Sequence, residues 1–162
     1  MALNDRRRFE FVWDAGALAA AFGVTREDVR EYLTDGRRAS FMVERRLKAL
    51  LGWQLAPSEG AAFDLRDRQG GLWEVRSITE SGVYFTPSNQ VGSGRSFDKA
   101  AYMRKLGALS GFILTDIVDF PTVRCFRIDV DMVLRWQKAG RLGTSARVSR
   151  TRFLTDLAKD VS

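Results

Sequence analysis

The chain contains a single cysteine, Cys125, and no histidine, so neither an internal disulfide nor a zinc site of several cysteines can hold it together. Its fold must therefore rest on a packed hydrophobic core. The chain has 162 residues, of which 45% are hydrophobic, and a chain of this size buries roughly 70% of the surface that its unfolded form exposes. These features predict one domain, with room for a small appendage.

The missing histidine also restricts the chemistry. It excludes nucleophilic triads with histidine, metal sites with histidine ligands and histidine general bases. Any reaction must therefore use carboxylates, lysine, arginine, tyrosine, serine or Cys125. We expect Cys125 to be a small buried hydrophobic residue, because it lies in a predicted strand between Arg124 and Phe126 with neither a histidine partner nor an acid nearby.

The charge of the chain favours nucleic acid as a partner. The net charge is +6, and only five of the 26 basic residues are lysine. Arginine binds phosphate through a planar fork with two parallel hydrogen bonds, which suits a nucleic-acid backbone. The alternative is a compositional bias of the genome, since alanine and glycine are also plentiful.

Nothing in the sequence indicates a membrane partner. No segment approaches the ~20 consecutive apolar residues of a membrane span. The first residues read MALNDRRRFEF and lack the apolar core of a signal peptide. We therefore expect a soluble, cytoplasmic protein.

Residues 1–36 are predicted to form an N-terminal helical hairpin, with helices over 15–22 and about 26–34. The spacing of Ala19, Gly23 and Val29 resembles that of a helix-turn-helix, in which Arg26 and Arg30 would face a DNA groove. The alternative is an ordinary helical hairpin that packs on the main domain or on a dimer partner.

Residues 37–162 are predicted to form the main domain. The hydrophobic pattern indicates a helix over 40–51 and strands over 61–66, 72–79 and 83–86. A helix over about 97–108, capped by Ser96, and a buried strand over 111–117 follow. A further strand over 122–128 and a helix over about 130–138 precede the basic tail. That tail is either a phosphate-contacting arm or a solvated face with three apolar anchors, which are Phe153, Leu154 and Leu157.

Three charged residues of this domain are expected to converge. Glu74 and Arg76 are two positions apart on a predicted strand and therefore project from the same face. A tight turn at Gly70-Gly71 can bring Asp64 beside them. Two converging carboxylates raise each other's pKa unless a cation lies between them, and a hard divalent ion such as Mg²⁺ is the usual cation. The alternative is an ordinary surface salt bridge.

This segment, GAAFDLRDRQGGLWEVRSIT, resembles the active-site hairpin of the PD-(D/E)xK nuclease superfamily. The helix, three-strand, helix, strand order of residues 40–117 is similar to the restriction-endonuclease-like core of that superfamily. Within it, the chain looks most like small Type II restriction enzymes, because Ser58-Glu59-Gly60 leads to Asp64 and then to Glu74-Val75-Arg76-Ser77. The resemblance implies an α/β fold.

The resemblance further implies a Mg²⁺-dependent DNA endonuclease that acts on double-stranded DNA, expected to be a homodimer. Asp64, Glu74, the Val75 carbonyl and Glu44 on the first helix would be the metal ligands. The position that the family usually fills with lysine is Arg76, which cannot act as a base because arginine stays protonated. Either the enzyme works with arginine there, or a lysine from elsewhere takes the role; Lys99 is the best candidate.

Residues 87–95 form a glycine-rich loop before a predicted helix. Arg95 and Ser96 would bind the DNA backbone there, and Tyr102 and Arg104 on the helix would face the substrate. No Gly-Lys-Ser/Thr sequence follows, so a nucleotide cofactor is not expected. The loop is otherwise a flexible connection.

Two other functions remain open at this point. A non-catalytic DNA-binding regulator would use the helical hairpin and the basic surface around a decayed nuclease core. A structural or toxin-like protein would carry its positive charge incidentally. Metal binding separates the first hypothesis from these two, because it needs a functional carboxylate site.

Overall fold

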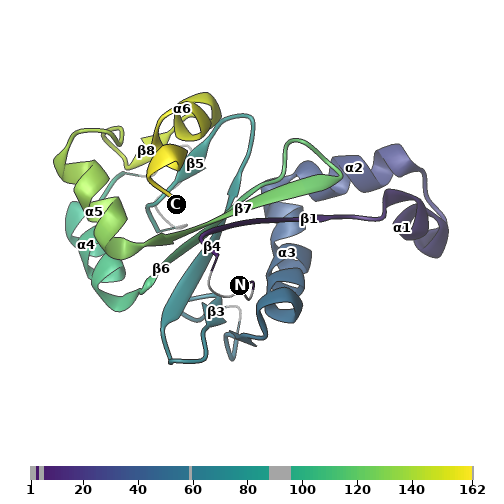
Figure 1. Ribbon diagram of the computed structural model, residues 1–162, viewed down its shortest axis with the longest axis horizontal. Coiled ribbons are helices and arrows are strands. Elements are labelled where there is room, and N and C mark those ends of the chain that lie inside the picture. The colour runs from purple at the N-terminus through teal and green to yellow at the C-terminus, as the bar shows by residue number, and fades with distance from the viewer. Residues whose placement is uncertain (1–2, 4–5, 59, 88–95, 162) are drawn as a thin grey trace.

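The computed structural model describes residue 3 and residues 6–58, 60–87 and 96–161 (Figure 1). The protein is a mixed α/β fold built on a six-stranded sheet with strand order β1-β7-β6-β4-β3-β2. A separate two-stranded sheet pairs β5 with β8. Within the described part, no helix is both long and apolar enough to cross a membrane.

The bounds of the elements are as follows. The strands of the main sheet are β1 (Arg8–Val12), β2 (Gln54–Leu55), β3 (Leu65–Arg66), β4 (Leu72–Ile78), β6 (Gly111–Asp116) and β7 (Thr122–Asp129), and those of the small sheet are β5 (Val83–Tyr84) and β8 (Arg147–Val148). The helices are α1 (Ala15–Phe22), α2 (Arg26–Thr34), α3 (Gly36–Leu51), α4 (Lys99–Ala108), α5 (Val130–Lys138) and α6 (Arg150–Thr155), followed by the 3-10 helix η3 (Leu157–Asp160).

The central strands β4 and β6 run parallel, whereas the other neighbouring strands of the sheet are antiparallel. A parallel pair needs a crossover connection, and this one contains β5 and α4. On the other side of β4, the short strands β2 and β3 complete an antiparallel meander. The meander ends after a few pairs, so within the described residues part of β4 has no strand partner on that side.

Helices cover both faces of the sheet and make two core layers. On one face α3 buries Val43 and Leu47 against Trp73 of β4. On the other face α4, α5 and α6 pack against Ile78 and Phe112 and against the side chains around them. Because side chains alternate along a strand, β4 contributes to both layers.

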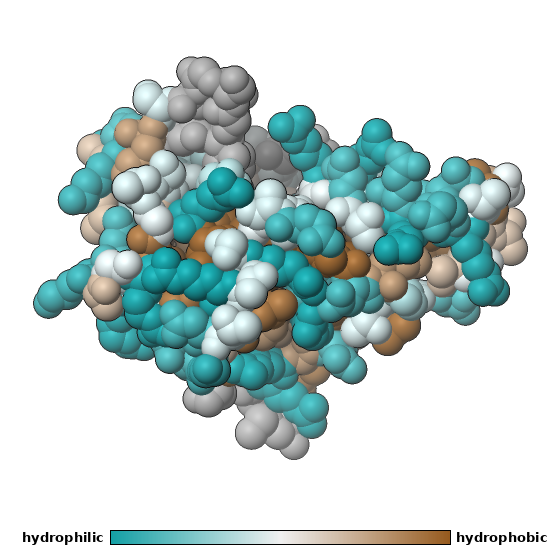
Figure 2. Space-filling view, turned by 90° about the horizontal axis from the view of Figure 1, so that it is seen from above, coloured by the Kyte–Doolittle hydropathy of each residue, from teal (hydrophilic) through white to brown (hydrophobic). Residues whose placement is uncertain are grey.

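The helices α1 and α2 form a lobe at one end of the molecule (Figure 1). Gly23 ends α1 in the left-handed conformation, and Thr25 and Asp28 form a capping box at the start of α2. The lobe has its own small core of Ala19, Val29 and Leu33. Hydrophilic side chains dominate the face in Figure 2, with hydrophobic atoms reaching the surface between them.

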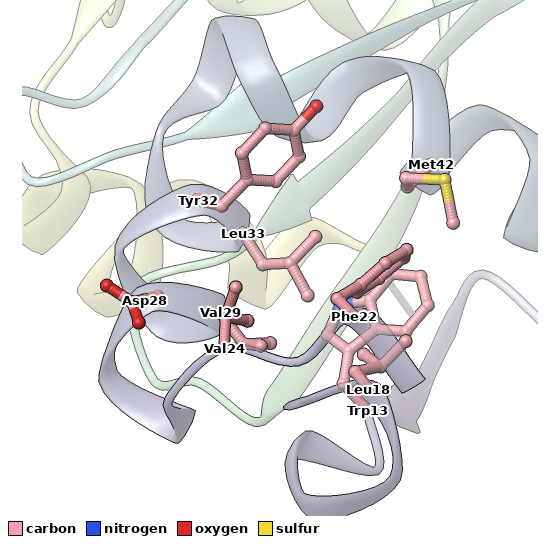
Figure 3. Close-up of a pocket in the computed structure, with 9 residues that line it drawn as sticks. All are labelled: Trp13, Leu18, Phe22, Val24, Asp28, Val29, Tyr32, Leu33 and Met42. Carbon is pink, nitrogen blue, oxygen red and sulfur yellow. The ribbon is translucent and has the colours of Figure 1, made fainter. Parts of the chain in front are cut away.

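An apolar pocket of about 390 Å³ opens in this lobe (Figure 3). Trp13 and Met42 reach it from outside the two lobe helices, and Tyr32 lines it from α2.

Both helices of the predicted hairpin are confirmed with their predicted bounds. However, residues 1–36 also contain β1, which the sequence analysis did not find and which pairs with β7 at the edge of the main sheet.

Several predicted elements differ in their extent. The strand expected over 61–66 is reduced to Leu65–Arg66, and the strand expected over 83–86 lies in the small sheet. The third strand of the meander is β2, which the sequence analysis missed. The helix α4 begins at Lys99 with Asp98 as its cap, so the prediction that Ser96 caps it is wrong.

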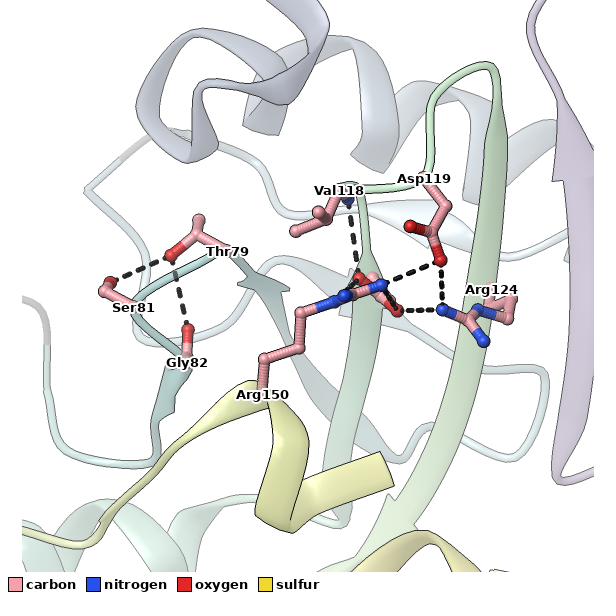
Figure 4. A network of polar contacts seen from close by, with 8 residues as sticks. Thr79, Ser81, Gly82, Val118, Asp119, Arg124 and Arg150 are labelled. Carbon is pink, nitrogen blue, oxygen red and sulfur yellow. Dashed lines mark hydrogen bonds and ion pairs between the residues drawn. The ribbon is translucent and has the colours of Figure 1, made fainter. Parts of the chain in front are cut away.

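The C-terminal tail is packed against the sheet. Arg150 at the start of α6 makes two hydrogen bonds to the fully buried carboxylate of Asp116 at the end of β6, and Asp119 and Arg124 complete the network (Figure 4). The apolar anchors Phe153 and Leu157 are fully buried. Arg141 pairs with two acidic residues of the tail, Asp156 and Asp160. The structure thus favours the anchored tail over a free basic arm.

Candidate active site

The end of the short strand β3 places Asp64 beside β4. The ladder between the two strands has only two pairs, Leu65 with Trp73 and Arg66 with Leu72. Immediately before them, Oδ2 of Asp64 accepts the backbone N–H of Val75 at 2.7 Å. The carboxylate therefore replaces the backbone acceptor that β4 loses where β3 turns away.

The turn between the strands is held by another carboxylate. Asp67 accepts hydrogen bonds from the backbone N–H groups of Gln69 and Gly71 and from the indole nitrogen of Trp73. Gly70 has a positive φ of 88°, which favours glycine. Asp67 is thus a structural residue, and it fixes the hairpin that presents Asp64.

Glu74 is the centre of a buried ion network. Its side chain is 7% exposed, and its two oxygens contact two different cations. Nη2 of Arg76 lies 2.7 Å from Oε1, and Nζ of Lys105 lies 2.7 Å from Oε2. The expectation that Glu74 and Arg76 share one face of β4 is confirmed by this contact.

Burial raises the pKa of Asp64 above its ordinary value, and the negative charge of Glu74 raises it further. The hydrogen bond from Val75 and the charges of Arg76 and Lys105 act in the opposite direction. The site thus holds two carboxylates and two cations that balance each other. A partly buried carboxylate with a raised pKa is typical of a functional site, although structural ion networks show the same feature.

The oxygen donors of the site fit a hard divalent cation. Besides the two carboxylates, the Val75 carbonyl lies on the Asp64 side of β4, because the N–H and C=O of one strand residue point to the same side. Over the described ranges, Oδ1 of Asp64 has no hydrogen-bond partner. Mg²⁺ takes such oxygen ligands and keeps several waters. Glu74 would have to exchange at least one of its cation contacts for the metal.

Glu44 was expected as a further ligand. It lies on α3, whose residues Val43 and Leu47 pack on the face of the sheet opposite to Glu74. Among the residues that the structure describes, no third acidic side chain joins Asp64 and Glu74 in a group that could hold a metal. The structure therefore does not bring Glu44 into the site.

The lysine that reaches the site is Lys105. Lys99 is exposed at the first position of α4. Lys105 lies further along the helix than Lys99, where its ammonium group reaches Glu74. Helical phase does not separate the two lysines, because both lie within about 100° of the buried residues Tyr102 and Leu106, so no signal in the sequence identified Lys105.

The residues expected to bind DNA have different outcomes. Arg95 lies outside the described residues. Ser96 and Arg104 are exposed, as are Arg26 and Arg30 on α2, so their roles stay predictions. The prediction for Tyr102 is wrong: its side chain is fully buried in the core beside the ring of Phe97, where it cannot meet DNA.

Sequence analysis missed one exposed cation near the site. Arg66 pairs with Leu72 across the hairpin, so it projects from the same face of the sheet as Glu74. Its guanidinium lies 5.4 Å from the ring centre of Phe63.

No protein-family model matches the chain, and no curated protein matches it significantly.

Proposed function

We propose that the protein is a metal-dependent DNA endonuclease that hydrolyses phosphodiester bonds. The observation that carries this proposal is the meeting of Asp64 and Glu74 on one sheet face, with Arg76 and Lys105 both in contact with Glu74. This arrangement provides oxygen ligands for a cation and positive charge for a phosphate at the same place. A single surface salt bridge would need neither the burial nor the second carboxylate.

The order of elements supports the same proposal. The helix α3, the meander β2-β3-β4, the helix α4 and the strand β6 parallel to β4 follow the order of the restriction-endonuclease-like core. Asp64 adjoins the second strand of the meander and Glu74 lies on the third. We assign the chain to the PD-(D/E)xK superfamily on this combination of order and site.

The residues of the site have different roles in this proposal. Asp64, Glu74 and the Val75 carbonyl would hold Mg²⁺, which when bound polarises the scissile phosphate and supplies a hydroxide-like water. Lys105 places positive charge where negative charge develops on the phosphate, and Arg76 holds Glu74. Neither cation has to remove a proton, which agrees with the presence of arginine at the motif position.

The substrate is double-stranded DNA in this proposal, and the enzyme acts in the cytoplasm as a homodimer. The net charge of +6 attracts a polyanion. Three exposed cations, Arg66, Lys99 and Arg104, come from the hairpin and the helix that flank Glu74. Two identical subunits related by a two-fold axis would cut the two antiparallel strands.

The proposal is tested with conservative variants of the two carboxylates. We expect Asp64→Asn and Glu74→Gln to abolish cleavage of linear duplex DNA in Mg²⁺, because each removes a charged ligand from a hard ion. Glu80→Gln, at an exposed turn after β4, is the matched control and should cut like the wild-type protein. Circular dichroism checks that all three variants fold. Cleavage by Asp64→Asn at the wild-type rate would contradict the proposal.

A second function is favoured by one observation. Both oxygens of Glu74 already contact cations, so the ion network is balanced without a metal. Such a network suits a non-catalytic DNA-binding regulator with a decayed nuclease core. This function predicts salt-dependent DNA binding that needs neither metal nor Glu74, together with no cleavage in Mg²⁺ or Mn²⁺.

A further inference from the structure

We propose that Arg76 is a positioning residue, which ties Glu74 to the backbone of Thr86 and leaves the contact with the substrate phosphate to Lys105. This inference rests on the proposed nuclease function. It concerns the one position at which the sequence departs from the motif that it resembles. The reason for the departure lies in what the guanidinium of Arg76 contacts.

Arg76 connects two parts of the chain. Its Nη2 atom lies 2.7 Å from Oε1 of Glu74 and donates a hydrogen bond to the carbonyl of Thr86 at 2.9 Å. The side chain of Arg76 is 15% exposed, and Thr86 is 1% exposed. The contact therefore fixes the carboxylate of β4 to the segment that follows β5.

Thr86 is a firm point of attachment. The preceding residue, Phe85, is fully buried, and its backbone N–H donates to the carbonyl of Ala146 at 3.0 Å. Its ring meets the ring of Phe112 edge to face at 5.2 Å between centres. Just before it, Val83 pairs with Val148 in the small sheet. Through its contacts with Glu74 and Thr86, Arg76 thus fixes the position of Glu74 relative to this small sheet.

An arginine suits this task better than a lysine. Both contacts come from Nη2, whose two N–H bonds point in fixed directions within the plane of the guanidinium, whereas a lysine carries one compact charge on a flexible stem. A lysine at position 76 could still pair with Glu74, but it would lack the planar geometry that aligns Glu74 with Thr86. Residues that orient a metal ligand in this way typically change metal affinity or activity by about 10- to 100-fold when they are replaced.

Lys105 is arranged for contact with a ligand. Its Nζ atom lies 2.7 Å from Oε2 of Glu74, and its side chain is 19% exposed. Within the described residues, Glu74 is the acceptor that Lys105 contacts. An ammonium group has three donors, so two of them remain for phosphate oxygens. The two cations of the site therefore differ in role: one holds the carboxylate and the other faces the substrate.

The test uses two variants that separate these roles, and Arg135→Lys on the exposed side of α5 is the matched control. We expect Arg76→Lys to weaken Mn²⁺ binding to the DNA-free protein by about 10-fold or more, measured by calorimetry, and to need correspondingly more metal for cleavage. We expect its Phe85 amide to exchange with solvent several-fold faster. Lys105→Gln should bind Mn²⁺ at least as tightly as the wild-type protein and lose about 10²- to 10³-fold in the single-turnover rate at saturating metal.

Two results would overturn the inference. One is an Arg76→Lys protein with wild-type Mn²⁺ affinity and wild-type exchange at Phe85, which would show that the bridge to Thr86 positions nothing. The other is a Lys105→Gln protein that cuts at the wild-type rate. If the wild-type protein neither binds Mn²⁺ nor cuts DNA, the proposed nuclease function fails, and the exchange at Phe85 still decides whether Arg76 forms the bridge.

Discussion

Replacement of Arg150 by alanine separates a structural role of the basic tail from a role in DNA binding. The carboxylate of Asp116 is fully buried, and Arg150 donates to both of its oxygens, at 2.9 Å from Nε and 3.1 Å from Nη2. Removing one partner of a buried ion pair costs about 3–5 kcal/mol when the remaining charge has no other partner. Here Arg124 stays 2.7 Å from Oδ2 of Asp116, so we expect about half of that cost, ~2 kcal/mol.

A loss of ~2 kcal/mol corresponds to a fall of about 4–8 °C in the midpoint of thermal unfolding for a domain of this size. Urea unfolding followed by circular dichroism measures the free energy directly. DNA affinity as a function of salt is measured on the same protein. Because the guanidinium of Arg150 is already paired with carboxylates, we expect the salt dependence to stay at the wild-type slope.

The control for this experiment is Arg152→Ala. Arg152 is exposed on the same helix, so its replacement should change stability by no more than about 0.5 kcal/mol. An Arg150→Ala protein with unchanged stability and a reduced salt slope would refute the reasoning. It would show that Arg150 leaves Asp116 to contact phosphate, as an arm would.

Three further outcomes follow from the structure. The hydrogen bonds from the indole N–H of Trp136 and from Arg141 hold the pKa of Asp160 below its ordinary value of 3.8. The stability that ionised Asp160 contributes is therefore present above that pH and is lost as the pH falls through the lower folded pKa, so Asp160→Asn should lower the unfolding midpoint at about pH 7 and lower it less as the sample is acidified. Tyr102→Phe should leave stability unchanged or raise it by up to about 1 kcal/mol in urea unfolding, because the buried hydroxyl has no hydrogen-bond partner within the described residues, and a loss above 2 kcal/mol would contradict this. Gly82→Ala should lower the free energy of unfolding by about 2–3 kcal/mol in the same assay. Gly82 has a φ of +100°, and an added Cβ would lie 2.1 Å from the carbonyl oxygen of Val148. A Gly82→Ala protein that unfolds at the wild-type urea midpoint would contradict this.

The helices were predictable where local signals define their ends. The bounds of α1 and α2 agree with the predicted ranges because Gly23 and Thr25 mark them within a few residues of sequence. The bounds of α5 agree as well, although its N-cap residue Asp129 makes no side-chain cap hydrogen bond. The strand β1 was missed because its partner β7 lies more than a hundred residues later. Strands of two residues, such as β2, leave no periodic pattern to read.

The site was predictable to the extent that it depends on strand periodicity. Two positions along one strand bring Glu74 and Arg76 to one face, and the glycine turn brings Asp64 beside them. The choice between Lys99 and Lys105 depends on where α4 lies along its axis relative to Glu74, which is set by packing against the sheet. The pairing of Arg150 with Asp116 depends on how the tail folds back, and charge alone gave no sign of it.

The most direct test of the central claim is incubation of the wild-type protein with supercoiled plasmid DNA, with Mg²⁺ and with Mg²⁺ chelated by EDTA. The account predicts nicked or linear products on a gel with Mg²⁺ and intact supercoiled DNA with EDTA, because Asp64 and Glu74 need a divalent ion to act on a phosphodiester. Intact plasmid in Mg²⁺ and also in Mn²⁺, from a protein that still retards DNA on the gel, would contradict the nuclease assignment and favour the DNA-binding regulator.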